Sequence, residues 1–138
     1  MITIKQASIS DLKDIQELNH QLCIKEATEF DSTINQDFSI TSAGEEYFKE
    51  RITGEDSIVF LAKESNKIVG YMIGAMVEIQ DYRTIKSLAE AENMFILEKY
   101  RGKGIGSQLL NSFVEWSKSK GAIRIKAITS FQRGLSLR

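Results

Sequence analysis

The sequence predicts an α+β fold, a mostly antiparallel central sheet flanked by helices, and three observations support this prediction. The chain has 138 residues, which suits one domain spanning 1–138. Its 42% hydrophobic and 27% charged residues are typical of a globular protein with an apolar core. Hydrophobic periodicity indicates the order strand, helix, helix, three strands, helix, strand. Because the three central strands follow one another without a helix between them, we expect them to pair antiparallel.

The first predicted elements are a short strand and a long helix. Residues 2–6 alternate apolar and polar side chains, as a strand does. Ser8 and Asp11 have the spacing of a capping box, with the shorter Asp in place of Glu. The helix that follows extends to about residue 28, and its apolar side chains recur at helical spacing at Leu12, Ile15, Leu18 and Leu22.

A second helix is predicted after a loop. Residues 30–41 show no hydrophobic period and are expected to be irregular. Ser42 and Glu45 again have capping-box spacing, which places the amino-terminal cap at Ser42. Gly54 is well placed to end this helix, whose apolar residues are Tyr47, Phe48 and Ile52.

The next segment is predicted to form a β-hairpin. Residues 57–63 and 67–79 are apolar runs of strand type, and the three residues between them are polar. Residues 80–87 are expected to form a loop.

The last elements are a strand, a turn, a helix and a strand. We expect a strand at 88–97, a turn at 98–104 and a helix at 105–120 that ends before a glycine. Residues 122–128 alternate again and predict a final strand. The apolar face of the helix contains Leu109, Phe113 and Trp116, which we assign to the core.

Charge and hydropathy exclude several classes of partner. The 18 basic and 19 acidic side chains give a net charge of −1, without the basic excess expected of a non-specific nucleic-acid binder. No apolar run approaches the roughly 18 residues of a membrane span. Met1 leads directly into a predicted strand rather than a signal peptide. We therefore expect a cytoplasmic protein with neither a nucleic-acid nor a membrane partner.

The content of cysteine and histidine excludes further chemistry. Cys23 is the one cysteine and His20 the one histidine, so neither an internal disulfide nor a Cys/His zinc site can be assembled, and no metal is expected. Ser-His-Asp catalysis would require His20 as its base. His20 lies off the apolar stripe of its helix and is predicted to be solvated. Cys23 is interpreted as a small packing residue.

The segment that carries chemistry is the glycine-rich turn at 101–106. Its three glycines leave a backbone with little side-chain obstruction and lead unpaired N–H groups into the first turn of a helix. The helix dipole adds partial positive charge there, and Arg101 and Lys103 add formal charge. Such a turn suits a phosphate, and a diphosphate is a physically sensible ligand.

Two phosphate-binding motifs fit this turn poorly. The spacing differs from a Walker P-loop because Lys103 precedes the last two glycines. A dinucleotide-binding fingerprint requires a G-x-G-x-x-G spacing and an acidic residue about 20 positions on, and neither is present. The glycines could also serve only to connect the strand to the helix. Because three glycines occur in so short a turn, this interpretation is less favoured.

Arg101-x-x-Gly104-x-Gly106, between an apolar strand and an amphipathic helix, resembles the acyl-CoA-binding motif of the GNAT superfamily of N-acetyltransferases. The preceding elements, including the hairpin with Ile68, Val69 and Gly70, occur in the family's order. The resemblance covers roughly residues 1–128. It implies the acyl-CoA N-acyltransferase fold and acetyl-CoA as co-substrate.

The resemblance implies a set of cofactor-binding residues. The turn would hold the CoA diphosphate through Arg101, Gly102, Lys103, Gly104, Ile105, Gly106 and Ser107. In the family the preceding strand is bulged and splays from its neighbour. Its backbone at Met94, Phe95 and Ile96 would then pair with the pantetheine arm like an added strand, and the strand at 122–128 would form the other wall.

The implied reaction moves an acetyl group from acetyl-CoA to a primary amine of a small molecule or a protein. Glu92 is the predicted catalytic base, since it precedes Met94 by two residues and is expected on the same face of the strand. Glu90 is a weaker candidate for the base. The alternative interpretation of Glu92 is an ordinary strand residue exposed to solvent. The amide of Ile96 would stabilise the oxyanion. The preceding loop, with Asp81, Tyr82 and Arg83, could line the acceptor site.

After residue 128 the sequence departs from the family. The remaining residues contain no tyrosine to protonate the leaving thiolate, so we expect slow catalysis, with Tyr82 or solvent as the acid. The tail resembles a natural truncation or a shifted reading frame. It lacks the usual helix and last strands, which leaves an open sheet edge, and we expect a homodimer. The alternative functions are a catalytically impaired CoA-binding domain with a sensing or assembly role, and an unrelated phosphate-binding module.

Overall fold

The computed structural model describes residues 1–79, 84 and 87–127 of the 138-residue chain. The strands are β1 (Ile2–Gln6), β2 (Ser57–Glu64), β3 (Lys67–Val77), β4 (Leu88–Ile96) and β5 (Arg124–Ala127). The α-helices are α1 (Leu12–Glu29), α2 (Ser42–Thr53) and α3 (Ile105–Ser119), and the short 3-10 helices are Ile9–Asp11, Phe38–Ile40 and Glu98–Tyr100.

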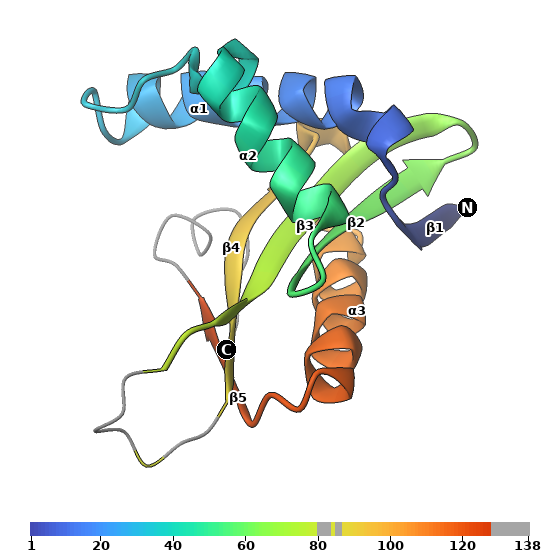
Figure 1. The fold of residues 1–138 in the computed structure, drawn as a ribbon. Helices are drawn as coiled ribbons and strands as arrows, with labels where there is room; N and C mark the ends of the chain where they lie inside the picture. The colour runs from blue at the N-terminus through green and yellow to red at the C-terminus, as the bar shows by residue number, and fades with distance from the viewer. Residues whose placement is uncertain (80–83, 85–86, 128–138) are drawn as a thin grey trace.

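The strands form one sheet in the order β1-β2-β3-β4-β5. The pairs β1–β2, β2–β3 and β3–β4 are antiparallel, and β4–β5 is parallel. α1 and α2 cover one face of the sheet and α3 covers the other (Figure 1). The predicted α+β fold with a mostly antiparallel sheet is therefore confirmed. Residue 128, the last of the predicted final strand, lies outside the described residues.

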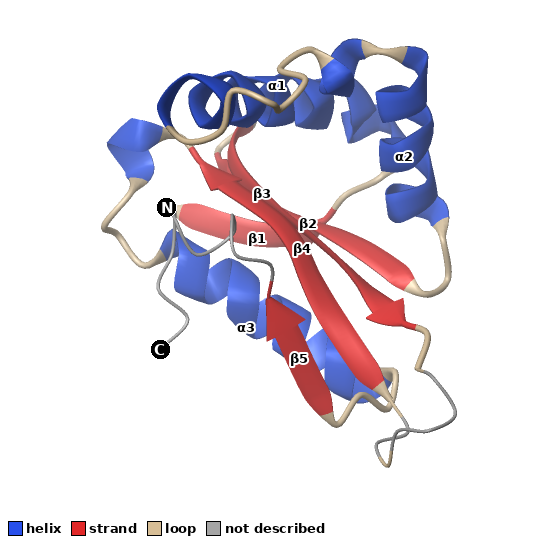
Figure 2. Cartoon of the chain, turned by 90° about the vertical axis from the view of Figure 1, so that its left-hand side faces the viewer, coloured by secondary structure: helices blue, strands red, loops and turns tan. Residues whose placement is uncertain are grey.

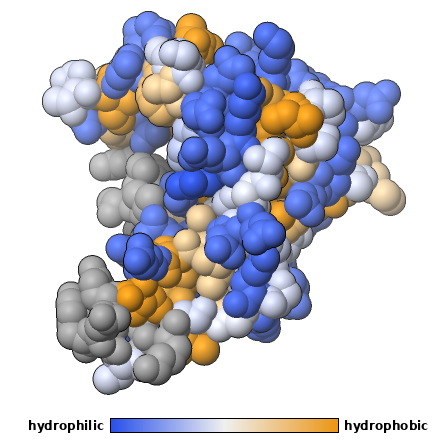
Figure 3. Space-filling model, in the orientation of Figure 1, coloured by the Kyte–Doolittle hydropathy of each residue, from blue (hydrophilic) through white to orange (hydrophobic). Residues whose placement is uncertain are grey.

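Each face of the sheet carries its own apolar core. Beneath α3 the core includes Met72, Ala91, Ile105, Leu109 and Phe113. Beneath α1 and α2 it contains Ile15, Phe48, Ile52, Leu61 and Tyr71. The outer surface of α2 is mostly hydrophilic (Figure 3), as expected of a helix that buries one stripe against a sheet.

The capping pattern predicted one helix start correctly and missed the other by one residue. Ser8 and Asp11 form the expected capping box, with Ser8 N–H donating to Asp11 Oδ2 at 2.9 Å. At α2 the cap is Thr41, whose hydroxyl accepts from Gly44 N–H at 3.1 Å. The prediction that Ser42 caps this helix is wrong, because Thr41 has the extended backbone of a cap residue and Ser42 is already helical.

β4 contains a β-bulge. Asn93 pairs with Ile73 and Ala91 with Gly74, so Glu92 is an extra residue with no partner on β3. Ala91 and Met94 both pack in the core beneath α3. Glu92 contacts α2 on the opposite face. The prediction that Glu92 and Met94 share a face is wrong, because the inserted residue interrupts the alternation of the strand.

No helix in the described ranges is long and apolar enough to cross a bilayer.

Candidate active site

The glycine turn has the backbone geometry that a bound anion requires. Gly102 and Gly104 have φ of 74° and 82°, in the left-handed region that favours glycine. Gly104 is the cap residue of α3, and no side chain caps the helix there. The first helical hydrogen bond joins Gln108 N–H to the Gly104 carbonyl at 3.1 Å. The N–H groups of 105–107 come before it and have no acceptor within the helix.

Open space lies in front of this turn. A Cβ atom added at Gly102 or Gly104 would meet no described atom within 4 Å. The dipole of α3, a helix of 15 residues, adds positive character at this end. The turn therefore presents unpaired amides and partial positive charge to accessible space, which is the arrangement that binds phosphate.

The two basic residues of the turn lie differently. Arg101 folds back on β4: its Nε donates to the Ile96 carbonyl at 2.8 Å, and its guanidinium lies 5.4 Å from the ring centroid of Phe95. Lys103 is exposed and lies 5.7 Å from the ring centroid of Tyr100. Arg101 thus fixes the turn to the end of the strand, while Lys103 remains accessible.

β5 pairs with the first four residues of β4. Their parallel pairing covers Leu88–Ala91 against Arg124–Ala127. Beyond it, no described residue of β5 pairs with 92–96. Figure 2 shows β5 beside the first part of β4, and β4 continues past the end of β5. The predicted bulge is present. The residues that follow β5 lie outside the described ranges, so the splay beside Met94, Phe95 and Ile96 stays a prediction.

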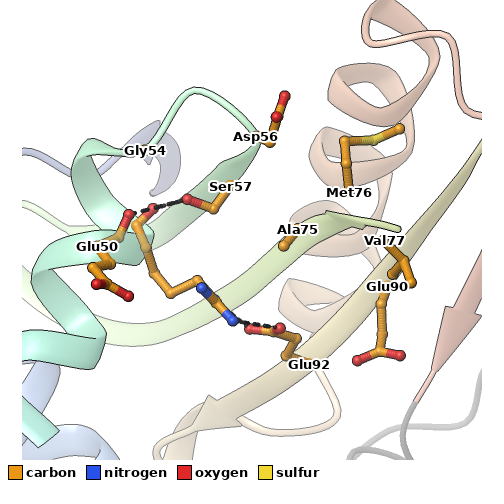
Figure 4. A pocket seen from close by; sticks show the side chains of 10 residues that line it. Glu50, Gly54, Asp56, Ser57, Ala75, Met76, Val77, Glu90 and Glu92 are labelled. Atoms are coloured by element: carbon orange, nitrogen blue, oxygen red, sulfur yellow. Dashed lines mark hydrogen bonds and ion pairs between the residues drawn. The ribbon is translucent and has the colours of Figure 1, made fainter. Parts of the chain in front are cut away.

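Glu92 is held by two side chains of α2. Arg51 Nε donates to Glu92 Oε1 at 2.7 Å, and Arg51 Nη2 donates to Oε2 at 2.9 Å (Figure 4). The Tyr47 hydroxyl donates to Oε1 at 2.9 Å. Burial, and then the charge of Glu92, raise the pKa of Tyr47 well above its usual range, so this phenol remains a donor at physiological pH. The hydrogen bond to Glu92 raises the pKa of Arg51.

A pocket of about 420 Å³ adjoins this group (Figure 4). It lies between the end of α2 and the facing ends of β2, β3 and β4. Glu90 lines the same pocket as Glu92, and its Oε2 lies 3.7 Å from Lys126 Nζ. The lining residues are Glu50, Arg51, Gly54, Asp56, Ser57, Ala75, Met76, Val77, Glu90 and Glu92. An acceptor that enters here would meet mainly carboxylates and apolar side chains.

The remaining predicted residues lie away from the turn or outside the described ranges. His20 is 20% exposed, so it is partly accessible to solvent, and its Nε2 lies 2.9 Å from Oδ1 of the exposed Asp37. Cys23 is half-buried, burial raises its pKa, and its Sγ contacts Asn19 Oδ1 at 3.4 Å, as a packing residue would. Asp81, Tyr82 and Arg83 lie outside the described residues.

Sequence reasoning missed the role of Arg51 and Tyr47. Tyr47 was expected on the apolar face of its helix, and Arg51 was not singled out. The two residues are four apart on α2 and so lie on the same face of the helix. That spacing is a weak signal, because the partner, Glu92, is 41 residues from Arg51 in the sequence.

Within the described residues, no three His, Cys, Asp or Glu side chains are grouped to hold a metal ion.

This fold, with its bulged β4 and glycine turn, is that of the acyl-CoA N-acyltransferases. The chain belongs to the acetyltransferase (GNAT) family, whose model matches residues 23–134. None of the curated protein sequences compared with the chain matches it.

Solved structures share the fold at low sequence identity. A predicted acetyltransferase from Clostridium acetobutylicum, solved with acetyl-CoA, superposes with a TM-score of 0.79 at 20% identity, over 97% of this chain and 84% of that one. The aminoglycoside N-acetyltransferase AAC(6')-Iy, solved with CoA, gives 0.74 at 18%, over 94% and 77%. An aminoglycoside acetyltransferase from an uncultured soil metagenomic sample, solved with sisomicin, gives 0.67 at 22%, over 93% and 77%.

Proposed function

We propose that the protein transfers an acetyl group from acetyl-CoA to a primary amine of a small molecule or a protein, in the cytoplasm. The observation that carries the proposal is the glycine turn, with its free α3 amides and open space, which follows the bulged strand β4. The fold neighbours solved with CoA, acetyl-CoA or an aminoglycoside support this chemistry.

In this proposal the chain's residues divide into two groups. The amides from Gly102 to Ser107, with Lys103, hold the diphosphate, and the backbone at 94–96 pairs with the pantetheine arm. The amide of Ile96 stabilises the oxyanion. Glu92 receives the proton of the attacking amine as the new N–C bond forms and the thioester C–S bond breaks. The leaving thiolate takes its proton from Tyr82 or solvent.

Gly104→Ala, with Gly121→Ala as its matched control, tests the cofactor site. Both glycines have left-handed backbones, with φ of 82° and 86°, and open space at Cβ. Each alanine should cost about 1–2 kcal/mol of stability. Only Gly104→Ala, where a methyl group would enter the anion site, should weaken acetyl-CoA binding, by about tenfold or more in calorimetry. Equal affinities for the two variants would contradict the proposed site.

Thiol release separates the proposed enzyme from its alternatives. Turnover with any amine of a panel of polyamines, aminoglycosides, amino acids and peptides supports the transferase. Saturable acetyl-CoA binding without turnover supports a CoA-binding domain with a sensing or assembly role. Binding of inorganic diphosphate, without either CoA species, indicates an unrelated phosphate-binding module.

A further inference from the structure

Glu92 is the bulged residue of β4, and α2 holds its carboxylate from one side. Two donors of Arg51 and the hydroxyl of Tyr47 all reach it within 2.9 Å. The Arg51 guanidinium also lies 4.8 Å from the ring centroid of Tyr47, which fixes the two donors relative to each other. The side chains of Arg51 and Glu92 are 27% and 16% exposed, so the pair is largely shielded from water.

The hydrogen bonds from Arg51 and Tyr47 leave one acceptor position of the Glu92 carboxylate unused. A carboxylate has about four acceptor positions, two on each oxygen. Oε1 accepts from Tyr47 and from Arg51 Nε, while Oε2 accepts from Arg51 Nη2. Among the described residues, the remaining acceptor position is therefore on Oε2. Glu92 also lines the pocket of about 420 Å³, where an acceptor would have room.

α2 is also attached to the sheet by apolar packing, independently of this ion pair. Phe48 and Ile52 of α2 are buried in the core with Val59 and Leu61 of β2, and this packing docks the helix. A bidentate guanidinium, by contrast, sets both the plane and the rotation of a carboxylate, which a single ammonium cannot do. The geometry is thus suited to orienting Glu92.

We propose that Arg51, supported by Tyr47, is a positioning residue that directs Oε2 of Glu92 toward the acceptor amine. The inference rests on the proposed transferase function and extends it. Arg51 acts through Glu92 and does not touch the reacting atoms. Its loss lets the carboxylate rotate, so that the acceptor amine is no longer held and deprotonated from a fixed direction.

The test compares Arg51→Met, Arg51→Lys and Tyr47→Phe, with Lys49→Met as the matched control. Lys49 is a cation on the same helix that pairs with Glu45 at 3.4 Å. The acceptor is whichever of spermidine, sisomicin and a lysine-containing peptide the unmodified protein acetylates fastest. Arg51→Met should lower kcat/KM for that acceptor by about ten- to a hundredfold. Its Kd for acetyl-CoA should stay within about twofold, because the cofactor site is separate.

The conservative variants separate positioning from stability. Arg51→Lys should recover part of the lost kcat/KM, since it can restore one of two hydrogen bonds, and Tyr47→Phe should show a smaller loss than Arg51→Met. Lys49→Met should leave kcat/KM unchanged. If circular dichroism shows that Arg51→Met does not fold, the test rests on Arg51→Lys and Tyr47→Phe. A kcat/KM equal to that of the unmodified protein in both variants would overturn the inference.

The two proposals fail in different ways. No thiol release from the unmodified protein with any acceptor overturns the transferase function, and the role of Arg51 with it. Turnover by the unmodified protein together with unchanged kcat/KM in a folded Arg51→Met variant overturns only the role of Arg51.

Discussion

The hydroxyl of Tyr71 lies in a buried chain of polar contacts that crosses from α1 to β4. Asn19 Nδ2 donates to the hydroxyl at 2.7 Å, and the hydroxyl donates to Asn93 Oδ1 at 2.8 Å. The Ser39 hydroxyl donates to Asn19 Oδ1 and extends the chain to the 3-10 helix before α2. Tyr71 is fully buried, and each of these polar groups has a partner. The bulge is thus anchored at Asn93 as well as at Glu92.

Tyr71 should make the protein sensitive to alkali. Burial raises its pKa well above the usual value of about 10. Above about pH 10 the phenol of Tyr71 is deprotonated in the unfolded chain but stays protonated in the folded protein. The free energy of unfolding should therefore fall as pH rises, by up to about 1.4 kcal/mol per pH unit from this group. Urea denaturation at pH 9, 10 and 11 measures the slope.

Tyr71→Phe is the comparison. It should be less stable at pH 9, because Asn19 and Asn93 lose their shared partner, but its stability should fall less steeply above pH 10. A slope equal to that of the unmodified protein would exclude this role for Tyr71.

At the scale of elements, the start of α2 gives a direct test of its cap. The Thr41 hydroxyl accepts from Gly44 N–H and donates to the Phe38 carbonyl at 2.6 Å. Thr41→Ala should lower the free energy of unfolding by about 1 kcal/mol. Ser42→Ala, one residue further on, is the control and should cost clearly less, because no capping bond depends on it. Equal losses in urea denaturation would place the cap at Ser42 instead.

The helices and most strands could be predicted because their signals are local. The apolar period of α3, the Ser8 capping box and the alternation of β1 each lie within a few residues in the sequence. The bulge in β4 also had a local signal, since Glu92 and Asn93 are adjacent polar residues after a stretch that alternates from Ala89. The prediction assumed strict alternation along the strand and therefore placed Glu92 on the wrong face.

The site was predictable only in part, for a similar reason. Arg101, Gly102 and Gly104 lie in one short turn, whose geometry follows from glycine at positive φ. The surroundings of Glu92 depend on Tyr47 and Arg51, which are 45 and 41 residues away. Such contacts arise from tertiary packing, and no spacing in a single sequence specifies them.

At the scale of the whole molecule, the outer edge of β5 bears on the oligomeric state. Among the described residues β5 is the last strand of the sheet, and Ile123 and Ile125 are 64% and 38% exposed. An uncovered edge with apolar side chains tends to pair with another chain. We therefore still predict a homodimer formed through this edge.

Sedimentation velocity at micromolar concentration tests the dimer. Ile125→Lys places a charge on the edge strand and should shift the protein to monomer. Ile40→Lys changes a more exposed isoleucine, 57% against 38% for Ile125, before α2 and should leave the dimer intact. A strictly monomeric unmodified protein would rule out the prediction.

The bulge at Glu92 also bears on how this molecule could diversify. Ala91 and Met94 pack beneath α3, and Phe95 packs beneath α1 and α2. Without residue 92, only Asn93 would separate Ala91 from Met94, and the strand would alternate without interruption. Position 92 is therefore an insertion in the strand, and its contacts with α2 are polar contacts with Arg51 and Tyr47. In the proposed transferase, evolution could exchange residues 92 and 51 together and so change the chemistry that faces the pocket, while the pairing of β4 with β3 is kept.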